Sequence, residues 1–181
     1  MKDLPPVHHD DGTTLYRHCP RCGGRLEARV VMEHDPPRLV CADCSFVFYL
    51  DPKVAVGAIC RAGDGIVLLR RGIEPGYGKW VYPGGYVDRG ETLEAAARRE
   101  AREEIHADIR ITGLINAYSY AGRPVIVVVY AADVVGGELR GGEEALEVRV
   151  FARGAIPWDD LAFRSTAEAL RDFLSGHARR F

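Results

Sequence analysis

Three glutamates near the middle of the 181-residue chain have the spacing of one helix flank. Glu100, Glu103 and Glu104 lie one turn apart at about 100° per residue, so their carboxylates converge. Like charges at this spacing cost roughly a few tenths of a kcal/mol per pair, and a helix tuned only for stability would interleave lysines there. Carboxylates beside the Gly84-Gly85 turn are the oxygen ligands of a hard cation, which indicates Mg²⁺ or Mn²⁺. The alternative is a solvated helix face carrying ion pairs such as Arg99–Glu103.

A second group that could do chemistry is a cysteine quartet made of two CxxC pairs: Cys19 with Cys22, and Cys41 with Cys44. One CxxC turn points two thiolates at a single ion, and two such turns complete the tetrahedral four-sulfur shell that zinc accepts. Four ligands leave no open position, so this Zn²⁺ is expected to be structural rather than catalytic. Two disulfides or four free thiols are the alternatives. The fifth cysteine, Cys60, stands in an apolar run and is expected to be a small buried side chain.

The elements that must position these groups follow from periodicity and turn residues. Strands are predicted over residues 54–60, 66–69, 109–117, 125–133 and 146–151, and helices over 92–105 and 165–175. Strands and helices mix without a regular βαβ alternation, which predicts an α/β fold with a mixed sheet. On the first helix, an apolar stripe at four-residue spacing from Leu93 to Ile105 would dock the helix on the sheet. Ser165 and Glu168 are spaced as a capping box at the start of the second helix.

Composition and charge narrow the class of protein. Hydrophobic residues make up 47% of the chain and the formal net charge is -2, which is typical of a soluble globular protein and disfavours nucleic acid or an anionic membrane as the main partner. Thiols without a recognisable export signal indicate a reducing compartment, so a cytoplasmic protein is expected. Residues 1–50 are assigned to an N-terminal tail and the cysteine module, and residues 51–181 to the main domain, with Asp51-Pro52 as the boundary.

The segment around the three glutamates resembles the Nudix box, in which a glycine, five residues, a glutamate and seven further residues precede Arg-Glu-apolar-x-Glu-Glu-x-Gly. The residues that fall in register are Gly85, Glu91, Arg99, Glu100, Ala101, Glu103 and Glu104. His106 stands where the family has glycine, and it would have to end the helix in a left-handed conformation. The resemblance implies a Nudix α/β/α sandwich preceded by a small zinc ribbon. It also implies a hydrolase that cleaves nucleoside diphosphates linked to another group.

The same resemblance implies roles for the residues of the box. Glu100 and Glu104 would hold the Mg²⁺ or Mn²⁺, helped by a carbonyl of the Gly84-Gly85 loop. Glu103 would be a further ligand or a base, and Arg99 would orient the carboxylates. A cation held in this way would clamp the diphosphate oxygens and lower the pKa of the attacking water.

Residues outside the box complete the expected site. Four side chains that precede it are expected to bind substrate: Arg70, Arg71, Trp80 and Tyr82. The rings would stack on a base, with burial in the core as the alternative, and an arginine would meet a phosphate, with a solvated strand end as the alternative. Glu144 and Glu147 lie in an acidic loop that could supply a further ligand or the general base. A solvated acidic loop is the alternative there.

The chain from Cys19 onward also resembles ribbon-bearing Nudix enzymes that include plastid FAD pyrophosphatases, through residues 51–57, 70–75, 144–149 and 161–163. The Ser-Gln-Pro-Trp-Pro-Phe-Pro motif of NADH pyrophosphatases is missing after the box, where residues 116–124 read Asn-Ala-Tyr-Ser-Tyr-Ala-Gly-Arg-Pro. FAD, cleaved to AMP and FMN, is therefore the first expected substrate, with NADH and ADP-ribose as alternatives of the same small dinucleotide type. RNA binding or decapping, and ligand sensing without catalysis, are alternatives of another class. A homodimer is left open.

Overall fold

The computed structural model describes residues 16–176, 179 and 180. Its chain divides into two compact units, Met1–Pro52 and Lys53–Phe181. The smaller unit contains a three-stranded antiparallel sheet of β1 (Leu26–Arg29), β2 (Arg38–Cys41) and β3 (Val47–Phe48), with β2 in the middle. Its buried cluster has four members, Cys19, Leu26, Leu39 and Cys41, with Phe46 and Phe48 packed against them. A core this small contributes little folding free energy, which is typical of small units that a bound metal stabilises.

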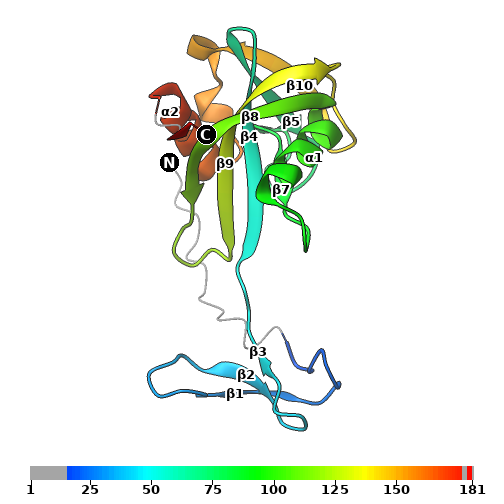
Figure 1. The fold of residues 1–181 in the computed structure, drawn as a ribbon, viewed down its shortest axis with the longest axis vertical. Helices are drawn as coiled ribbons and strands as arrows, with labels where there is room; N and C mark the ends of the chain where they lie inside the picture. Colours follow the sequence, from blue (N-terminus) through cyan, green and yellow to red (C-terminus); the bar gives the residue numbers. More distant parts are fainter. Residues whose placement is uncertain (1–15, 177–178, 181) are drawn as a thin grey trace. The chain divides into compact units, whose positions relative to one another are not determined.

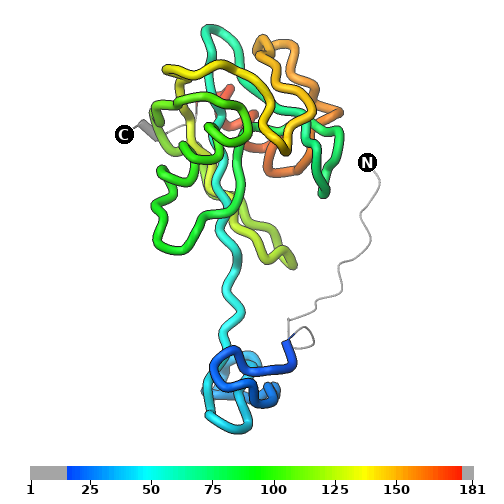
Figure 2. Tube along the Cα trace, turned by 90° about the vertical axis from the view of Figure 1, so that its right-hand side faces the viewer, coloured from blue at the N-terminus to red at the C-terminus, as the bar shows by residue number. Residues whose placement is uncertain are grey.

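The larger unit is built on one mixed sheet. Its strands are β4 (Lys53–Ala62), β5 (Gly65–Arg71), β6 (Trp80–Val81), β7 (Gly84–Tyr86), β8 (Ala107–Tyr118), β9 (Val125–Gly137), β10 (Ala145–Ala152) and β11 (Arg179–Arg180). The order is β10-β5-β4-β9-β8-β11, with β6 paired to β5 and β7 to β4. The central pair β4 and β9 is parallel and can be followed side by side in Figure 1 and Figure 2, whereas the other pairs are antiparallel. The predicted mixed sheet is confirmed.

Two α-helices cover the sheet: α1 (Leu93–Ile105) and α2 (Arg164–Leu174). In β9, Val128 and Tyr130 pack with Ala97 of α1, whereas the alternate residue Val129 belongs to the cluster that contains Leu170 of α2. Alternate residues of a strand point to opposite faces, so the helices lie on opposite sides of the sheet, as Figure 1 shows. The predicted α/β/α sandwich is confirmed. Two short 3-10 turns, Arg153–Ala155 and Trp158–Asp160, lead from β10 into α2.

The ends of α1 agree with the sequence. Thr92 caps the helix, since its Oγ1 accepts a 3.2 Å hydrogen bond from the Ala95 N–H. His106 follows the last helical residue with φ 51° and ψ 36°, so it adopts the left-handed conformation that the box normally assigns to glycine. The predicted stripe is buried along Ala97, Ala101 and Ile105, and this side of α1 contacts the sheet.

The start of α2 differs from the sequence prediction. The capping residue is Phe163, and no side chain caps the helix, so the predicted Ser165–Glu168 capping box is wrong. Ser165 is buried inside the first turn. The Glu168 carboxylate instead accepts hydrogen bonds from Arg164 Nε and Tyr120 Oη, both at 2.7 Å. Glu168 is therefore bound to Arg164 within the helix and to the distant Tyr120, and not to the backbone at the start of the helix. Among the described residues, no helix combines the length and apolar character needed to cross a membrane.

Candidate active site

The four cysteines of the ribbon are held by two loops of the same construction. In the first loop the Cys19 N–H donates to Gly24 O (2.7 Å) and Cys19 O accepts from the Gly23 N–H (2.9 Å). In the second, Cys41 makes the corresponding bonds with Phe46 O and the Ser45 N–H. The residue after each CxxC has a positive φ, 80° at Gly23 and 55° at Ser45. Each loop turns its two sulfurs to one side, toward the other loop.

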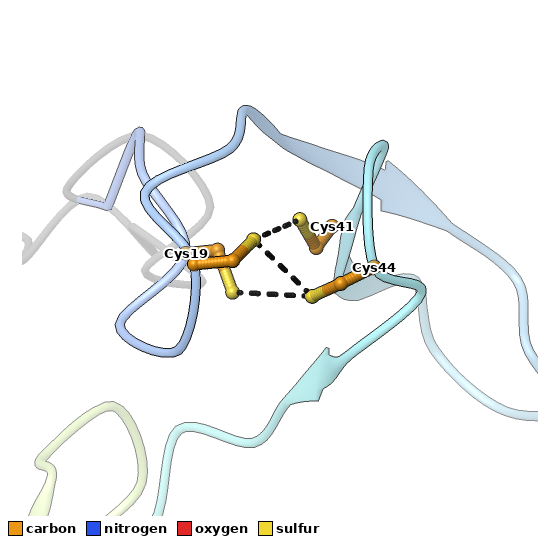
Figure 3. Close-up of side chains that lie close together, drawn as sticks. Cys19, Cys41 and Cys44 are labelled. Carbon is orange, nitrogen blue, oxygen red and sulfur yellow. Dashed lines mark hydrogen bonds between the residues drawn. The ribbon is translucent and has the colours of Figure 1, made fainter.

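The four sulfurs converge on one point. Their Sγ atoms all lie within 4.8 Å of one another, and Figure 3 shows three of the residues labelled. The Sγ–Sγ distances are 3.3 Å for Cys22–Cys44, 3.5 Å for Cys22–Cys41 and 3.8 Å for Cys19–Cys44. Zinc bonded to four sulfurs at about 2.3 Å places them about 3.8 Å apart, whereas a disulfide needs about 2.05 Å. The quartet therefore fits a tetrahedral zinc and is not two disulfides.

Protonation of the sulfurs supports the same conclusion. The backbone N–H groups of Cys44 and Asp43 help lower the pKa of Cys41 to about 7. At Cys22 the Gly24 N–H lowers the pKa, but the neighbouring sulfurs of Cys44 and Cys41 outweigh it and raise the pKa to about 12. Four thiolates cannot ionise side by side without a compensating charge, which a divalent ion supplies.

Gly84 and Gly85, which were expected in a loop, lie in strand β7 and are held close to the glutamates of α1. The Gly84 N–H donates a 2.7 Å hydrogen bond to Oε2 of Glu104. A Cβ on Gly85 would stand 2.5 Å from Oε1 of Glu100, and a Cβ on Gly84 would stand 2.2 Å from the Val56 carbonyl. Only glycine allows this close approach, because any side chain would displace the carboxylate or the neighbouring strand. The two glycines thus bring the backbone of β7 against Glu100 and Glu104.

Arg99 connects three of the glutamates of this segment. Its Nε and Nη2 donate to the two carboxylate oxygens of Glu91, at 3.0 and 2.9 Å. Its Nη1 contacts Glu100 at 2.7 Å and Glu103 at 3.1 Å, and its Nη2 also donates to the Tyr86 carbonyl at 3.1 Å. The bidentate pair with Glu91 fixes the plane of the guanidinium, and the remaining bonds orient the acids. These contacts raise the pKa of Arg99 and lower that of Glu91.

Burial disfavours the ionised form of two of these carboxylates, Glu100 and Glu104. Desolvation raises the pKa of Glu104 to about 7, against the lowering effect of the Gly84 N–H, and it also raises the pKa of Glu100. The charge of Glu144 adds to both shifts, and the charge of Arg71 opposes the shift at Glu104. A cation bound here would offset these penalties, since it favours the ionised carboxylates.

The loop that carries Glu144 is tied to the end of α1. The N–H groups of Arg140 and Gly142 donate to the carbonyls of Ile105 (3.3 Å) and Glu104 (3.0 Å), which have no partner within the helix. The Glu144 carbonyl in turn accepts 2.7 Å from the Gly72 N–H at the end of β5. The acidic loop is therefore anchored at both ends beside the buried glutamates, and the exposed Glu144 side chain acts electrostatically on them.

Comparison with known proteins identifies this arrangement. A family model described as the NUDIX domain matches residues 51–174, and one described as Nudix N-terminal matches residues 17–50. The chain belongs to the Nudix hydrolase family. A Nudix hydrolase structure from Nitrosomonas europaea is 33% identical and has a TM-score of 0.83, covering 89% of this chain and 94% of the other. The Nudix box and the ribbon predicted from sequence are thus confirmed.

Two curated relatives carry names that state a substrate. The ADP-ribose pyrophosphatase of Methanocaldococcus jannaschii is 33% identical over 139 residues, which are 75% of this chain and 78% of that protein. The NAD-capped RNA hydrolase NudC of Vibrio atlanticus is 28% identical over 135 residues, 74% of this chain but 48% of that protein. The Nudix chain described here therefore spans about half the length of the NudC relative.

The arginines predicted to bind phosphate both support the loop of residues 72–79. Arg70 Nε donates to Gly78 O and Arg71 Nε to Pro75 O, each at 2.8 Å. The Arg71 guanidinium also lies 5.2 Å above the ring of Phe163. The positive charge of Arg71 lowers the pKa of Glu104, so Arg71 acts electrostatically on the acidic residues of the Nudix box. Arg70 is exposed at the end of the strand.

The aromatic pair lies in the core. Trp80 is 6% and Tyr82 4% exposed, Trp80 packs edge-on against Phe151, and the Tyr82 hydroxyl bonds with Ser165. Burial also raises the pKa of Tyr82. Gly57 lies directly beneath the Tyr82 ring, where a Cβ would approach to 2.2 Å. The burial favours the core alternative for both rings over stacking on a base.

Other expected residues are separated from the buried acids. Glu147 forms an ion pair with Arg149 along β10 and faces Arg70 across the ladder with β5. Its position therefore gives less support for a catalytic role than that of Glu144. Cys60 is fully buried, as predicted, and burial raises the pKa of its thiol to about 12.

Sequence reasoning missed two backbone contributors to the site. The Tyr86 carbonyl holds Arg99, and Gly142 approaches α1 so closely that a Cβ would stand 2.0 Å from the Glu103 carbonyl. No side-chain motif signals either contact. The Gly141-Gly142 pair, which follows the longest strand of the sheet, could have indicated the second contact, because glycine often stands where two backbone segments approach closely.

A divalent cation fits the Nudix box residues on the structural evidence. Gly85 leaves the space that a side chain would fill beside Glu100, and Glu104 is a buried acid whose ionised form needs a positive partner. Within the described part of the chain, the cysteine quartet is the one group of three or more ligand side chains whose donor atoms come together. Arg99 forms ion pairs with Glu100 and Glu103, and these ion pairs set the orientation of the two acids.

Proposed function

We propose that this Nudix hydrolase cleaves the diphosphate bond of a nucleoside diphosphate linked to a second group, with Mg²⁺ or Mn²⁺ bound by Glu100, Glu104 and the Gly84-Gly85 loop. The observation that carries the proposal is the buried Glu104 carboxylate, held by the Gly84 N–H and facing the charges of Glu100 and Glu144. A fold would not retain such repulsion for stability alone. The bound cation would supply charge neutralisation at the phosphate oxygens and acidify water.

The chain's own residues have distinct parts in this reaction. Arg99 keeps the carboxylates in position through its bonds to Glu91 and the Tyr86 carbonyl. Arg71, whose charge already reaches Glu104, would bind a phosphate of the substrate. Glu144 would take the proton of the attacking water, since it stands on an anchored loop beside the buried acids. Glu103, which is 58% exposed, would serve as a further ligand.

ADP-ribose becomes the first substrate to test. It is the substrate in the name of the Methanocaldococcus jannaschii relative, and the alignment covers most of both proteins. FAD, the first expectation from sequence, rests on the shared stretches described above. NAD-capped RNA is a second candidate, because several relatives aligned over about three quarters of this chain carry that name. All three contain a diphosphate next to an adenosine.

The deciding experiment is a product assay with ADP-ribose, FAD, NADH and an NAD-capped RNA, each with Mg²⁺ and with Mn²⁺. AMP and the second phosphorylated product are identified by mass spectrometry. Glu104→Gln serves as the inactive control and Glu138→Gln, an exposed acid outside the box, as the matched active one. Hydrolysis of none of these compounds would contradict the proposal. Hydrolysis of FAD alone would restore the sequence expectation.

We further assign residues 1–50 to the tail and ribbon and residues 51–181 to the catalytic domain. The ribbon zinc is structural in this assignment, because its four ligand atoms close the coordination shell. Thiols that hold zinc require a reducing environment, for which the cytoplasm is the simplest choice. Elemental analysis of trimmed chains that begin near residue 51 tests whether the zinc resides in the first unit.

A further inference from the structure

The strand β10 ends the sheet as an open edge. Within the described residues it has a strand neighbour, β5, on one side only. It is eight residues long, and two of its apolar side chains are well exposed, Leu146 at 52% and Val150 at 43%. Long edge strands with exposed apolar residues pair readily with another strand, and stable monomers usually protect them with charges or proline. β10 contains no proline, and its charged residues are one glutamate and one arginine.

The sequence of this edge is complementary to itself. Around Val148 the residues read Leu-Glu-Val-Arg-Val, from Leu146 to Val150. If two copies of β10 paired antiparallel with the two Val148 residues opposite each other, each Glu147 would face the other copy's Arg149. Each Leu146 would face a Val150. Cross-strand pairs of opposite charge and of apolar side chains are the units that stabilise antiparallel sheets.

We propose that β10 is the interface through which two copies of this chain join their sheets into one continuous sheet. The two-fold axis would pass through Val148, so the contact is isologous and closes as a dimer rather than growing into a filament. The ladder between β10 and β5 is regular from Glu147 onward, so the residues nearest the axis already have extended backbone ready for pairing. In this register Glu147 and Arg149 of each copy would face residues of opposite charge in the other copy, and no charge would face a like charge.

The charge pair allows a test that separates the contact between chains from the ion pair within one chain. In one chain Arg149 already pairs with Glu147. Arg149→Glu places two acids on the edge, and Glu147→Arg places two arginines on it. Each variant alone would set like charges opposite each other and is expected to sediment as a monomer. An equal mixture of the two sets every acid opposite an arginine and is expected to form a one-to-one heterodimer.

Sedimentation velocity over a wide range of protein concentration measures the outcome. The unmodified chain and the double variant Glu147→Arg/Arg149→Glu are expected to be dimers, because both keep every facing pair opposite in charge. Circular dichroism melts confirm that each single variant is folded, and Val148→Lys provides a second disrupting change at the axis. An unmodified chain that stays monomeric, or single variants that dimerise as well as their mixture, would overturn the proposal.

Discussion

The backbone N–H of Gly84 and the carboxylate of Glu104 are joined by a 2.7 Å hydrogen bond that connects the start of β7 with the last turn of α1. The bond holds a buried acid against the two glycines of β7, at the place where the Nudix box would bind its cation. It makes Glu104 the residue whose replacement reports most directly on the site.

Replacement of Glu104 by glutamine is expected to lower the hydrolysis rate by orders of magnitude, each tenfold loss corresponding to about 1.4 kcal/mol of transition-state stabilisation. Glutamine keeps the shape and the acceptor for the Gly84 N–H but removes the charge that a cation needs. Steady-state kinetics under saturating Mg²⁺ or Mn²⁺ measures the effect, with Glu138→Gln as the exposed control. Equal rates for Glu104→Gln and the unmodified enzyme would eliminate the metal-ligand role.

The stability of the protein free of Mg²⁺ and Mn²⁺ is expected to depend on Glu104 as the pH changes. The folded-state pKa of about 7 lies above the ordinary value of 4.5, so the folded state favours the protonated acid. The stabilising contribution is complete below about pH 4.5 and is lost as the pH rises through 7. At pH 8 the free energy of unfolding, measured with urea, should therefore be higher for Glu104→Gln than for the unmodified protein by about 1–3 kcal/mol. Near pH 5 the two proteins should differ little.

Tryptophan fluorescence can follow the unfolding of the larger unit, which contains Glu104. The chain has two tryptophans, and both belong to the larger unit, so their emission reports unfolding of the catalytic domain while the ribbon keeps its zinc. Added Mg²⁺ is expected to stabilise the unmodified protein and not the variant, since binding requires the ionised carboxylate. A pH-independent difference between the two proteins would show that burial does not shift Glu104.

Replacement of Arg99 by lysine is expected to weaken metal binding or activity by about ten- to a hundredfold, as is usual for residues that orient metal ligands. Lysine keeps the charge but cannot span the two oxygens of Glu91 while also contacting Glu100 and the Tyr86 carbonyl. Measuring the hydrolysis rate as Mn²⁺ is titrated gives both the apparent metal affinity and the maximal activity of the variant. Arg98→Lys, on the neighbouring position of the same helix, is the control, and a loss of the same size there would point to a general effect on α1.

One tightly bound zinc per chain is expected, and Cys41→Ser should lose it. The sulfur separations of 3.3 to 3.8 Å match a tetrahedral ion, and serine supplies a poor ligand for a four-sulfur site. Elemental analysis of protein purified without added metal measures the content. Cys60→Ala, in the core of the other unit, should keep the zinc. A folded, metal-free ribbon with four free thiols would disprove the assignment.

Replacement of His106 by glycine is expected to preserve or slightly raise stability, by up to about 1 kcal/mol, because glycine adopts the left-handed conformation without steric cost. Against this gain, the variant loses the 3.3 Å contact between His106 Nδ1 and the Arg140 carbonyl. His106→Val should destabilise the protein by about 1–2 kcal/mol, since a branched side chain strains a φ of 51°. Thermal melts of the three proteins give the ranking, and a valine variant as stable as the glycine one would refute the argument.

The sequence alone determined the parts of this protein that depend on local spacing. Helical periodicity placed the glutamates and the buried stripe of α1, and the left-handed residue at His106 followed from its position in the box, where the family has glycine. Paired CxxC turns predicted the ribbon site, because neighbouring residues set the direction of each thiol. These features need few partners distant in sequence, so pattern and register were enough.

Tertiary structure decided the features that depend on what packs against each residue. Trp80 and Tyr82 have the residue types of a base-stacking site, yet the sheet and α2 enclose them. Ser165 has the spacing of a helix cap, but Glu168 bonds with Tyr120 of the loop between β8 and β9 instead. The raised pKa of Glu104 arises from burial by segments far apart in the chain, since desolvation depends on the surrounding volume rather than on sequence neighbours.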